Sequence, residues 1–181
     1  IFASTLGYSS EININKDITK GTKVTFENID KGTVLFIKDM NGLTLFEEKI
    51  KKIGTYSRAF DLTNLPDAEY YFEIDHSAEI KIIPFSIKER VPKFVSGTEY
   101  SIVKPEVKVE ENFVHISKNS LEEQDLDIKV YYEGSDLAFQ ESLKEVQTLN
   151  RTYDFSSSIK GHYIIVLTTE GRTLVNNINI P

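Results

Sequence analysis

An internal repeat constrains this chain more than any other feature of its sequence. A shift of 93 residues aligns the two halves without a gap and places apolar residues on apolar residues. The aligned positions Leu35, Ile37, Phe46 and Ile50 fall on Ile128, Val130, Phe139 and Leu143. A constant offset of this kind is the signature of a duplicated structural unit. The sequence therefore predicts two tandem domains with one fold.

The same offset continues through the next turns of the chain. Phe60, Asp61 and Leu62 fall on Tyr153, Asp154 and Phe155, and Ala68, Glu69 and Tyr70 fall on Gly161, His162 and Tyr163. An apolar strand follows in both halves. Because the repeat places Tyr70 and Tyr163 identically, we expect both rings to pack at a strand corner.

Within each half the apolar residues recur with a period of two. Leu126, Ile128, Val130 and Tyr132 alternate with more polar neighbours, which indicates a strand with one buried face. Turn-forming residues separate such runs, and the strongest hairpin signal is Asn41-Gly42. The other turn signals are Gly54, Pro66-Asp67, Gly134-Ser135, Lys160-Gly161 and Glu170-Gly171.

About seven strands are expected in each half, at the spacing typical of an immunoglobulin-like sandwich. The first set is 9–14, 22–27, 33–39, 43–50, 57–62, 68–75 and 78–85. The second set is 105–110, 112–117, 126–133, 136–143, 149–155, 161–169 and 172–180. The helix-compatible stretch 137–149 is interpreted as strand because of the repeat. The predicted fold class is all-β, with two tandem immunoglobulin-like β-sandwich domains.

The domain boundaries follow from breaks in the strand pattern. We expect domain 1 over 1–88, an ordered linker over 89–104 and domain 2 over 105–181. Pro92, Gly97 and Pro105 interrupt the pattern in and beside the linker. The linker also contains apolar residues, such as Phe94 and Ile102, so we expect it to pack against one or both domains.

The stretch 34–83 resembles the small β-sandwich domains of secreted Bacteroidetes proteins. These include the C-terminal sorting domains of Por (type IX) secretion and related small families of unknown function. The matching residues in the first half are Asp39, Asn41, Gly42, Asp61, Leu62, Leu65 and Tyr70. Those in the second half are Gly134, Asp154, Phe155, Ile159, Gly161, His162 and Tyr163. The resemblance implies a tandem immunoglobulin-like fold and a secreted, periplasmic or cell-surface location.

Two departures from that pattern count against a sorting role. Ala68 stands where these domains usually have glycine, and two similar units follow one another in a short chain. The chain begins at Ile1, which fits a mature product after removal of a signal peptide, or a form trimmed to the folded region.

Composition excludes several kinds of function. A net charge of −7 argues against a nucleic-acid partner, because phosphate binding requires a basic face and Lys49, Lys51 and Lys52 form the only small basic cluster. The chain has no cysteine, so disulfides, thiolate zinc sites and cysteine nucleophiles are absent. No apolar run approaches the ~20 residues of a membrane span.

The sequence contains no recognisable catalytic or metal-binding motif. His76, His115 and His162 show neither triad nor zinc-helix spacing, although a metal cluster assembled by the fold stays open. Adjacent glutamates at 47–48, 110–111 and 122–123 point to opposite faces of a strand, so they do not form a glycosidase pair. Asp39 with Asn41, or Asp125 with Asp127, offers oxygen ligands for calcium but lacks the loop motif. We expect no cofactor, no catalytic residue and no metal ligand.

Aromatic residues are the remaining candidates for a binding site. In Tyr70-Tyr71-Phe72 and Tyr131-Tyr132, strand alternation places at least one ring on the outer face. Exposed rings stack on sugars and dominate protein interfaces, although they are also ordinary strand formers. We take Tyr71 and Tyr131 as the predicted ligand or partner contacts.

The sequence therefore favours a non-catalytic extracellular or periplasmic module that binds a protein or glycan at the cell surface. The alternative is a structural spacer or a domain associated with secretion sorting. An enzyme is the least favoured of the three, because no nucleophile and base are paired by spacing.

Overall fold

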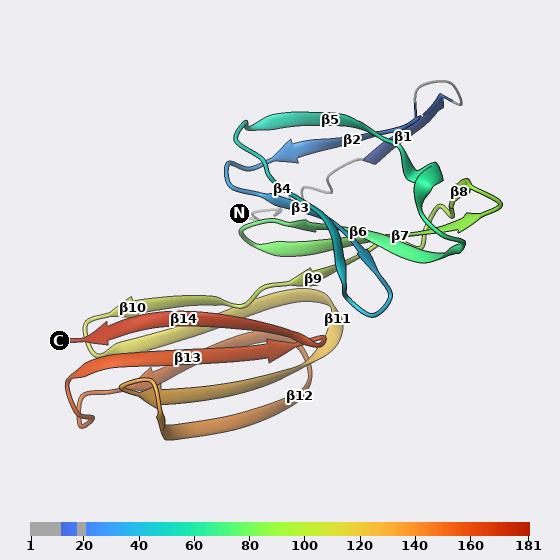
Figure 1. Ribbon diagram of the computed structural model, residues 1–181. Coiled ribbons are helices and arrows are strands. Elements are labelled where there is room, and N and C mark those ends of the chain that lie inside the picture. The colour runs from blue at the N-terminus through green and yellow to red at the C-terminus, as the bar shows by residue number, and fades with distance from the viewer. Residues whose placement is uncertain (1–11, 18–20) are drawn as a thin grey trace, which may run out of the picture. The chain divides into compact units, whose positions relative to one another are not determined.

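The computed structural model describes residues 12–17 and 21–181, and these residues are folded almost wholly into β-strands (Figure 1). Contacts between Cα atoms divide the chain into two compact units, Ile1–Ser101 and Ile102–Pro181. The division falls within the short strand β9 (Tyr100–Val103). The predicted all-β fold class is confirmed. Among the described residues no helix has the length and apolar character needed to cross a membrane.

Unit 1 is a sandwich of two antiparallel sheets, seen in Figure 1 as β1, β2 and β5 over β3, β6 and β7. The first sheet has the order β1 (Ile12–Asp17), β2 (Gly21–Ile29), β5 (Gly54–Phe60). The second has the order β4 (Thr44–Lys49), β3 (Val34–Asp39), β6 (Ala68–Asp75), β7 (Glu79–Lys88), β8 (Val91–Phe94), and β9 also pairs with β7. The 3-10 helix η1 (Leu62–Asn64) connects β5 to β6. Of the predicted first strand, 9–14, residues 9–11 lie outside the described part of the chain.

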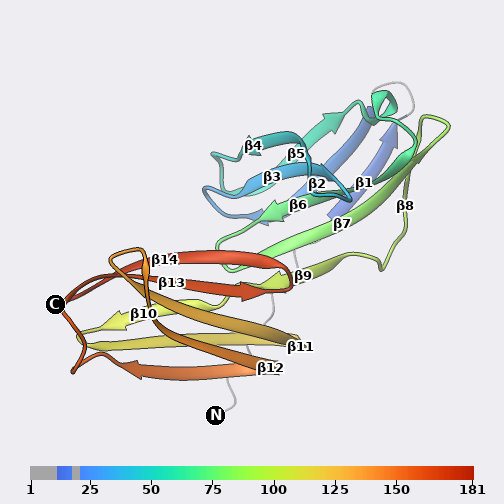
Figure 2. The same ribbon diagram turned by 60° about the horizontal axis from the view of Figure 1, so that its bottom comes forward.

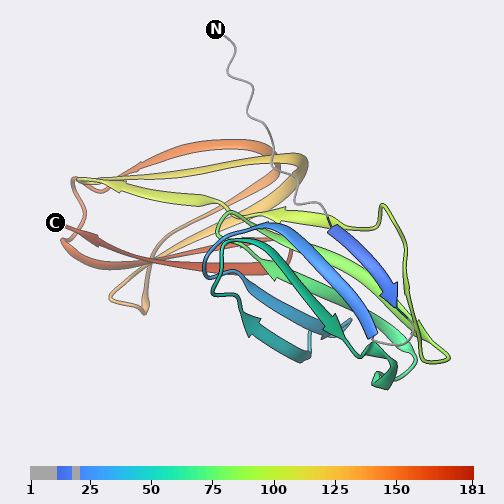
Figure 3. The ribbon, with the colours of Figure 1, turned by 90° about the horizontal axis from the view of Figure 1, so that it is seen from above.

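Unit 2 contains five strands, two of them very long. They are β10 (Glu106–Glu110), β11 (Phe113–Tyr132), β12 (Asp136–Asp154), β13 (Gly161–Thr169) and β14 (Arg172–Ile180). The first half of β11 pairs with β10 and the end of β12, and the second half pairs with β13 and the start of β12. Figure 3 shows β10 in one layer and the red strands β13 and β14 in the other.

The sequence divided each of these long strands in two, and the structure does not. The predicted strands 112–117 and 126–133 are parts of β11, and 136–143 and 149–155 are parts of β12, which run side by side in Figure 2. The β11–β12 register shifts between Asn119 and Gln124 and again before Leu126. Such bulges bend a strand and let it pass from one sheet to the other without a loop.

The 93-residue offset reappears in the strand pairing of the two units. Ile37 pairs with Phe46 and Phe72, and Val130 pairs with Phe139 and Ile165 at the corresponding positions. A register shift directly follows both Ile37 and Val130. The matching bulges and partners place the same residues of each half on the inner face of the sheet.

Burial agrees with this inner face, with one exception. The expected core residues Leu35, Ile37, Leu62, Tyr70, Phe72, Ile128, Val130, Phe155, Tyr163 and Ile165 are buried, and Phe46 is partly buried against the core. Phe139 was expected to be buried and is 42% exposed, so that prediction is wrong. Its strand forms the edge of the sheet there, and the ring rests against Tyr153 with centroids 5.4 Å apart.

A tyrosine closes the same corner in both units. The Tyr70 hydroxyl donates to the Pro66 carbonyl at 2.9 Å, and the Tyr163 hydroxyl donates to the Ile159 carbonyl at 2.7 Å. A tyrosine that bonds a few residues back at this point of the fold is the tyrosine corner of immunoglobulin-like sandwiches. The expected corner packing of Tyr70 and Tyr163 is confirmed.

Shortening a core residue of unit 2 is expected to destabilise it. Ile128 is fully buried, so Ile128→Ala should lower the free energy of unfolding by about 2–4 kcal/mol through lost burial and a residual cavity. Ile159→Ala makes the same change at an exposed side chain and should cost less than about 0.5 kcal/mol. Urea unfolding measures both, and equal losses would contradict the assigned core.

Removing the hydroxyl of Tyr70 or Tyr163 tests the tyrosine corner that the two units share. Tyr70→Phe and Tyr163→Phe keep the ring but leave a carbonyl without its donor, which should cost about 1 kcal/mol each in urea unfolding. Tyr71→Phe is the control, because Tyr71 is half-buried on the outer face. If Tyr71→Phe lowered the free energy of unfolding as much as Tyr70→Phe, the corner hydrogen bond would not be what stabilises unit 1.

Candidate functional site

The tip of the β3–β4 hairpin in unit 1 is a rigid turn. One oxygen of the Asp39 carboxylate accepts hydrogen bonds from the backbone N–H groups of Asn41 and Leu43, both at 2.9 Å. The Gly42 N–H donates to the Asp39 carbonyl at 2.9 Å, and Gly42 has a φ of 85°, which glycine adopts without strain. The predicted Asn41-Gly42 hairpin is confirmed. The Asp39 carboxylate therefore acts in turn formation.

This turn carries apolar side chains where polar ones are usual. Met40 is 61% exposed and Leu43 is 62% exposed, and the nearby Leu45 is also exposed. Single exposed apolar residues are common, but a group of them at one hairpin is characteristic of a contact surface. We refer to Met40, Leu43 and Leu45 as the apolar tip.

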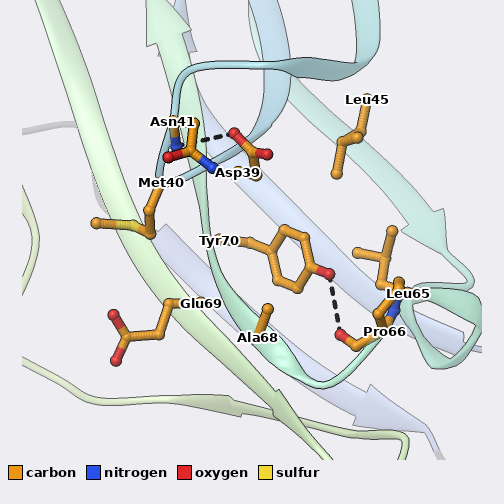
Figure 4. Close-up of a pocket in the computed structure, with 9 residues that line it drawn as sticks. All are labelled: Asp39, Met40, Asn41, Leu45, Leu65, Pro66, Ala68, Glu69 and Tyr70. Atoms are coloured by element: carbon orange, nitrogen blue, oxygen red, sulfur yellow. Dashed lines mark hydrogen bonds between the residues drawn. The ribbon is translucent and has the colours of Figure 1, made fainter.

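A groove of about 500 Å³ lies between the apolar tip and the tyrosine corner (Figure 4). Leu45, Leu65 and Pro66 lie on one side of the Tyr70 ring, and Met40 and Glu69 lie on the other. The polar atoms at the rim come from Asp39, Asn41 and Glu69. An apolar hollow with a few polar groups at its rim suits an apolar side chain of a partner.

A second, smaller hollow adjoins the same residues. It has a volume of about 220 Å³ and shares Met40, Glu69 and Tyr70 with the first groove. Lys93 and the exposed Val95, on and after β8, complete its wall. Met40 therefore lines two adjoining hollows.

Tyr71, one of the two predicted contacts, lies on the outer face of the second sheet of unit 1. It is half-buried and pairs with Lys38 on β3 and with Pro84 on β7. The Lys38 amine donates to the Glu73 carboxylate at 2.8 Å and lies 4.4 Å from the centre of the Phe36 ring. Tyr71 thus borders an ion pair, not an open aromatic platform.

Tyr131, the other predicted contact, occupies the same place in unit 2. It is half-buried, and it pairs with Leu137 on β12 and with Ile164 on β13. At the positions that hold Glu73 and Ile82 in unit 1, this sheet has Val166 and Val175. Leu137 is 50% exposed and Val175 is 57% exposed. The two positions that hold the Lys38–Glu73 ion pair in unit 1 are thus occupied by Tyr131 and Val166 in unit 2, beside the exposed Lys129.

The sequence identified neither the apolar tip nor the exposed Leu137 and Val175 on the outer face of unit 2. Tyr71 and Tyr131 belong to different units, and each contributes one ring to its own sheet. The signal for the tip was available, since Met40 and Leu43 directly flank an Asn-Gly turn where a soluble hairpin normally carries polar residues.

The histidines take separate structural roles. His76 is buried in the β6–β7 turn, 3.3 Å from the Thr33 hydroxyl. His115 lies 2.9 Å from the Thr152 hydroxyl and 3.7 Å from Glu110, and His162 is exposed on β13. Across residues 12–17 and 21–181 no group of three or more His, Cys, Asp and Glu is placed to hold a metal ion.

Two of the carboxylates considered for catalysis or calcium accept hydrogen bonds within the protein. Glu48 accepts from the Tyr56 hydroxyl at 2.9 Å and from Arg58. Asp125 accepts from the Lys144 amine at 2.7 Å and from the Glu145 N–H at 3.2 Å. These contacts account for Glu48 and Asp125 as structural surface groups.

Comparisons with known proteins return distant likenesses of structure only. No family model matches the chain, and no curated protein matches its sequence. The chicken interferon gamma receptor alpha chain is similar in structure over 95% of this chain and 97% of its own, at 8% identity and a TM-score of 0.35. The BSP domain of a biofilm-associated protein is similar over 90% of this chain and 27% of its own, at 13% identity and a TM-score of 0.29. The receptor tyrosine kinase Torso is similar over 95% and 73%, at 9% identity and a TM-score of 0.28.

The buried histidine makes the stability of unit 1 depend on pH. Burial lowers the pKa of His76 below its ordinary value of about 6.5, against the opposing effect of the Glu79 and Asp30 carboxylates. The unfolded chain then binds the proton first as the pH falls. The part of the stability of unit 1 that depends on a neutral His76 is fully present above pH ~6.5 and is lost progressively below it.

Replacing this histidine should remove that part of the pH dependence. Urea unfolding of the protein and of His76→Gln at pH 7.5 and pH 5.5 compares the two losses directly. We expect the loss on acidification to be smaller in His76→Gln. An equal or larger loss in the variant would contradict the lowered pKa.

Proposed function

We propose that this chain is a non-catalytic binding or adhesion module, and that unit 1 contacts its partner through the apolar tip and the adjoining groove. The observation that carries the proposal is the exposure of Met40 and Leu43 on a hairpin fixed by Asp39. A rigid turn presents these side chains without a large entropy loss on binding, which is the usual arrangement of an interface anchor.

The lining of the groove favours a protein partner over a glycan. Leu45, Leu65 and Pro66 offer aliphatic surface, whereas the Tyr70 ring is buried at the corner and does not provide an open stacking platform. The partner is proposed to lie at a cell surface, and the chain is proposed to act in the secreted, periplasmic or cell-surface location implied by its resemblance to secreted Bacteroidetes domains. Tyr71 and Tyr131 are retained as secondary contacts on the outer faces.

Binding of labelled protein to intact cells and envelope fractions of the source organism tests this function. The double variant Leu43→Ser with Leu45→Ser should reduce binding about tenfold or more, because it removes two of the three side chains of the apolar tip and leaves the turn hydrogen bonds in place. Ile53→Ser is the matched control, since Ile53 is an exposed aliphatic residue of the same unit outside the tip.

Further outcomes separate the competing functions. Loss of binding in Tyr71→Ser or Tyr131→Ser, with the tip variant unaffected, would move the contact to an outer face. Binding on a glycan array that survives the tip substitutions would replace the protein partner with a sugar. No binding by the unmodified chain in either assay would favour a structural spacer or sorting-associated role.

A further inference from the structure

We propose that β14 is a self-association edge, at which a second copy of this chain adds its own β14 in antiparallel orientation. In unit 1 the corresponding strand, β7, is covered by β8, which pairs with it from Phe85 to Lys88. Among the described strands, β14 pairs only with β13 (Figures 1 and 2). At the same position in the sandwich, the edge of β7 is therefore covered by a further strand in unit 1, and the edge of β14 in unit 2 is not.

The hairpin that precedes β14 determines which backbone groups face outward. Glu170 and Gly171 have φ values of 47° and 69°, as in a two-residue type I′ turn, so Thr169 and Arg172 form the closing hydrogen-bonded pair. Alternation then directs the N–H and C=O groups of even-numbered residues to β13 and those of odd-numbered residues to the open edge. The register runs from Thr169–Arg172 to Gly161–Ile180 without a bulge.

The odd-numbered residues that present this edge are exposed. They are Thr173, Val175, Asn177 and Asn179. A row of unpaired backbone groups in a long flat strand is a ready template for another strand unless the chain protects it.

The usual protection of an edge strand is missing from β14 beyond its first residue, Arg172. The edge strands β1, β4, β5, β8, β10 and β12 carry charged residues, and β8 also has Pro92. From Thr173 to Ile180 there is no charge and no proline. Two copies of this segment therefore meet without placing like charges opposite each other, whereas two copies of β4 or β10 would oppose charged side chains.

The pattern of β14 selects a second copy as the occupant, because the segment matches itself when reversed. With a two-fold axis at Asn176, Leu174 lies opposite Ile178 of the other copy and Asn176 lies opposite itself. Slipping the register by two residues in either direction places Asn176 opposite an apolar residue, Leu174 or Ile178. Apolar residues prefer apolar partners across a strand pair, which favours the register centred on Asn176. This centred register also pairs the longest stretch, 173–179.

This pairing joins the layers that contain β13 and β14 in two copies of unit 2 into one continuous sheet. Strand addition alone buries less than the ~1,200 Å² of a standard interface, so the dimer belongs to the weak, concentration-dependent class. The joined sheet would present the outer face containing Tyr131 and Val175 twice, on one continuous surface.

Sedimentation velocity over a range of protein concentrations tests the association. We expect a reversible dimer that strengthens with concentration. Asn177→Lys should weaken it about tenfold or more, because the lysines of the two copies then lie diagonally across the new pair. Ser142→Lys is the matched control, since it adds the same charge at an exposed position on the edge strand β12, opposite Asp127, and should leave the dimer unchanged. A protein that stays monomeric at the highest soluble concentration overturns the proposal.

Cysteine cross-linking tests the register, and the chain has no cysteine to interfere. In the centred register Asn176 forms a non-hydrogen-bonded pair with itself, at the ~4.5 Å Cα separation that a disulfide spans. Mild oxidation should therefore link Asn176→Cys at least ~10 times faster than Asn177→Cys, whose opposite residue is Val175. Melting curves establish that both variants fold. Equal rates, or faster linkage of Asn177→Cys, would overturn this register.

Discussion

The fold depends on a pair of neighbouring central strands in each unit, whose inner faces are mainly apolar. Ile37 opposite Phe72 and Val130 opposite Ile165 are buried in the two cores. Because side chains alternate along a strand, a one-residue slip of either pair would place a buried set in water. This cost fixes the register, and the register fixes the bulge, the hairpin and the tyrosine corner that follow it.

The outer faces of the same strands show how little the backbone determines function. At equivalent positions, unit 1 has the ion pair of Lys38 and Glu73, and unit 2 has Tyr131 and Val166. Neither face alters the core beneath it. A duplicated sandwich can therefore change the chemistry of one face while keeping its fold, and binding properties are assigned to each unit separately.

Sequence periodicity predicted the strands, the offset and the corner tyrosines, because burial in a sheet imposes a period of two on the chain itself. It did not predict that β11 and β12 are unbroken, since a bulge needs no turn-forming residue. It also misjudged Phe139, because an apolar residue at a sheet edge has the same sequence pattern as one at the centre. The grooves beside Met40 depend on side chains from several distant segments, which no local pattern reports.

The passage of β11 and β12 through both layers has a mechanical consequence. In unit 1 the turn at residues 30–33 separates β2 from β3, so each layer ends before the next begins. In unit 2 the paired strands β11 and β12 each continue from one layer into the other without a break in the backbone. Sliding one sheet over the other there requires bending these strands or breaking their mutual ladder, so unit 2 resists shear as a single body and transmits tension from sheet to sheet along its backbone.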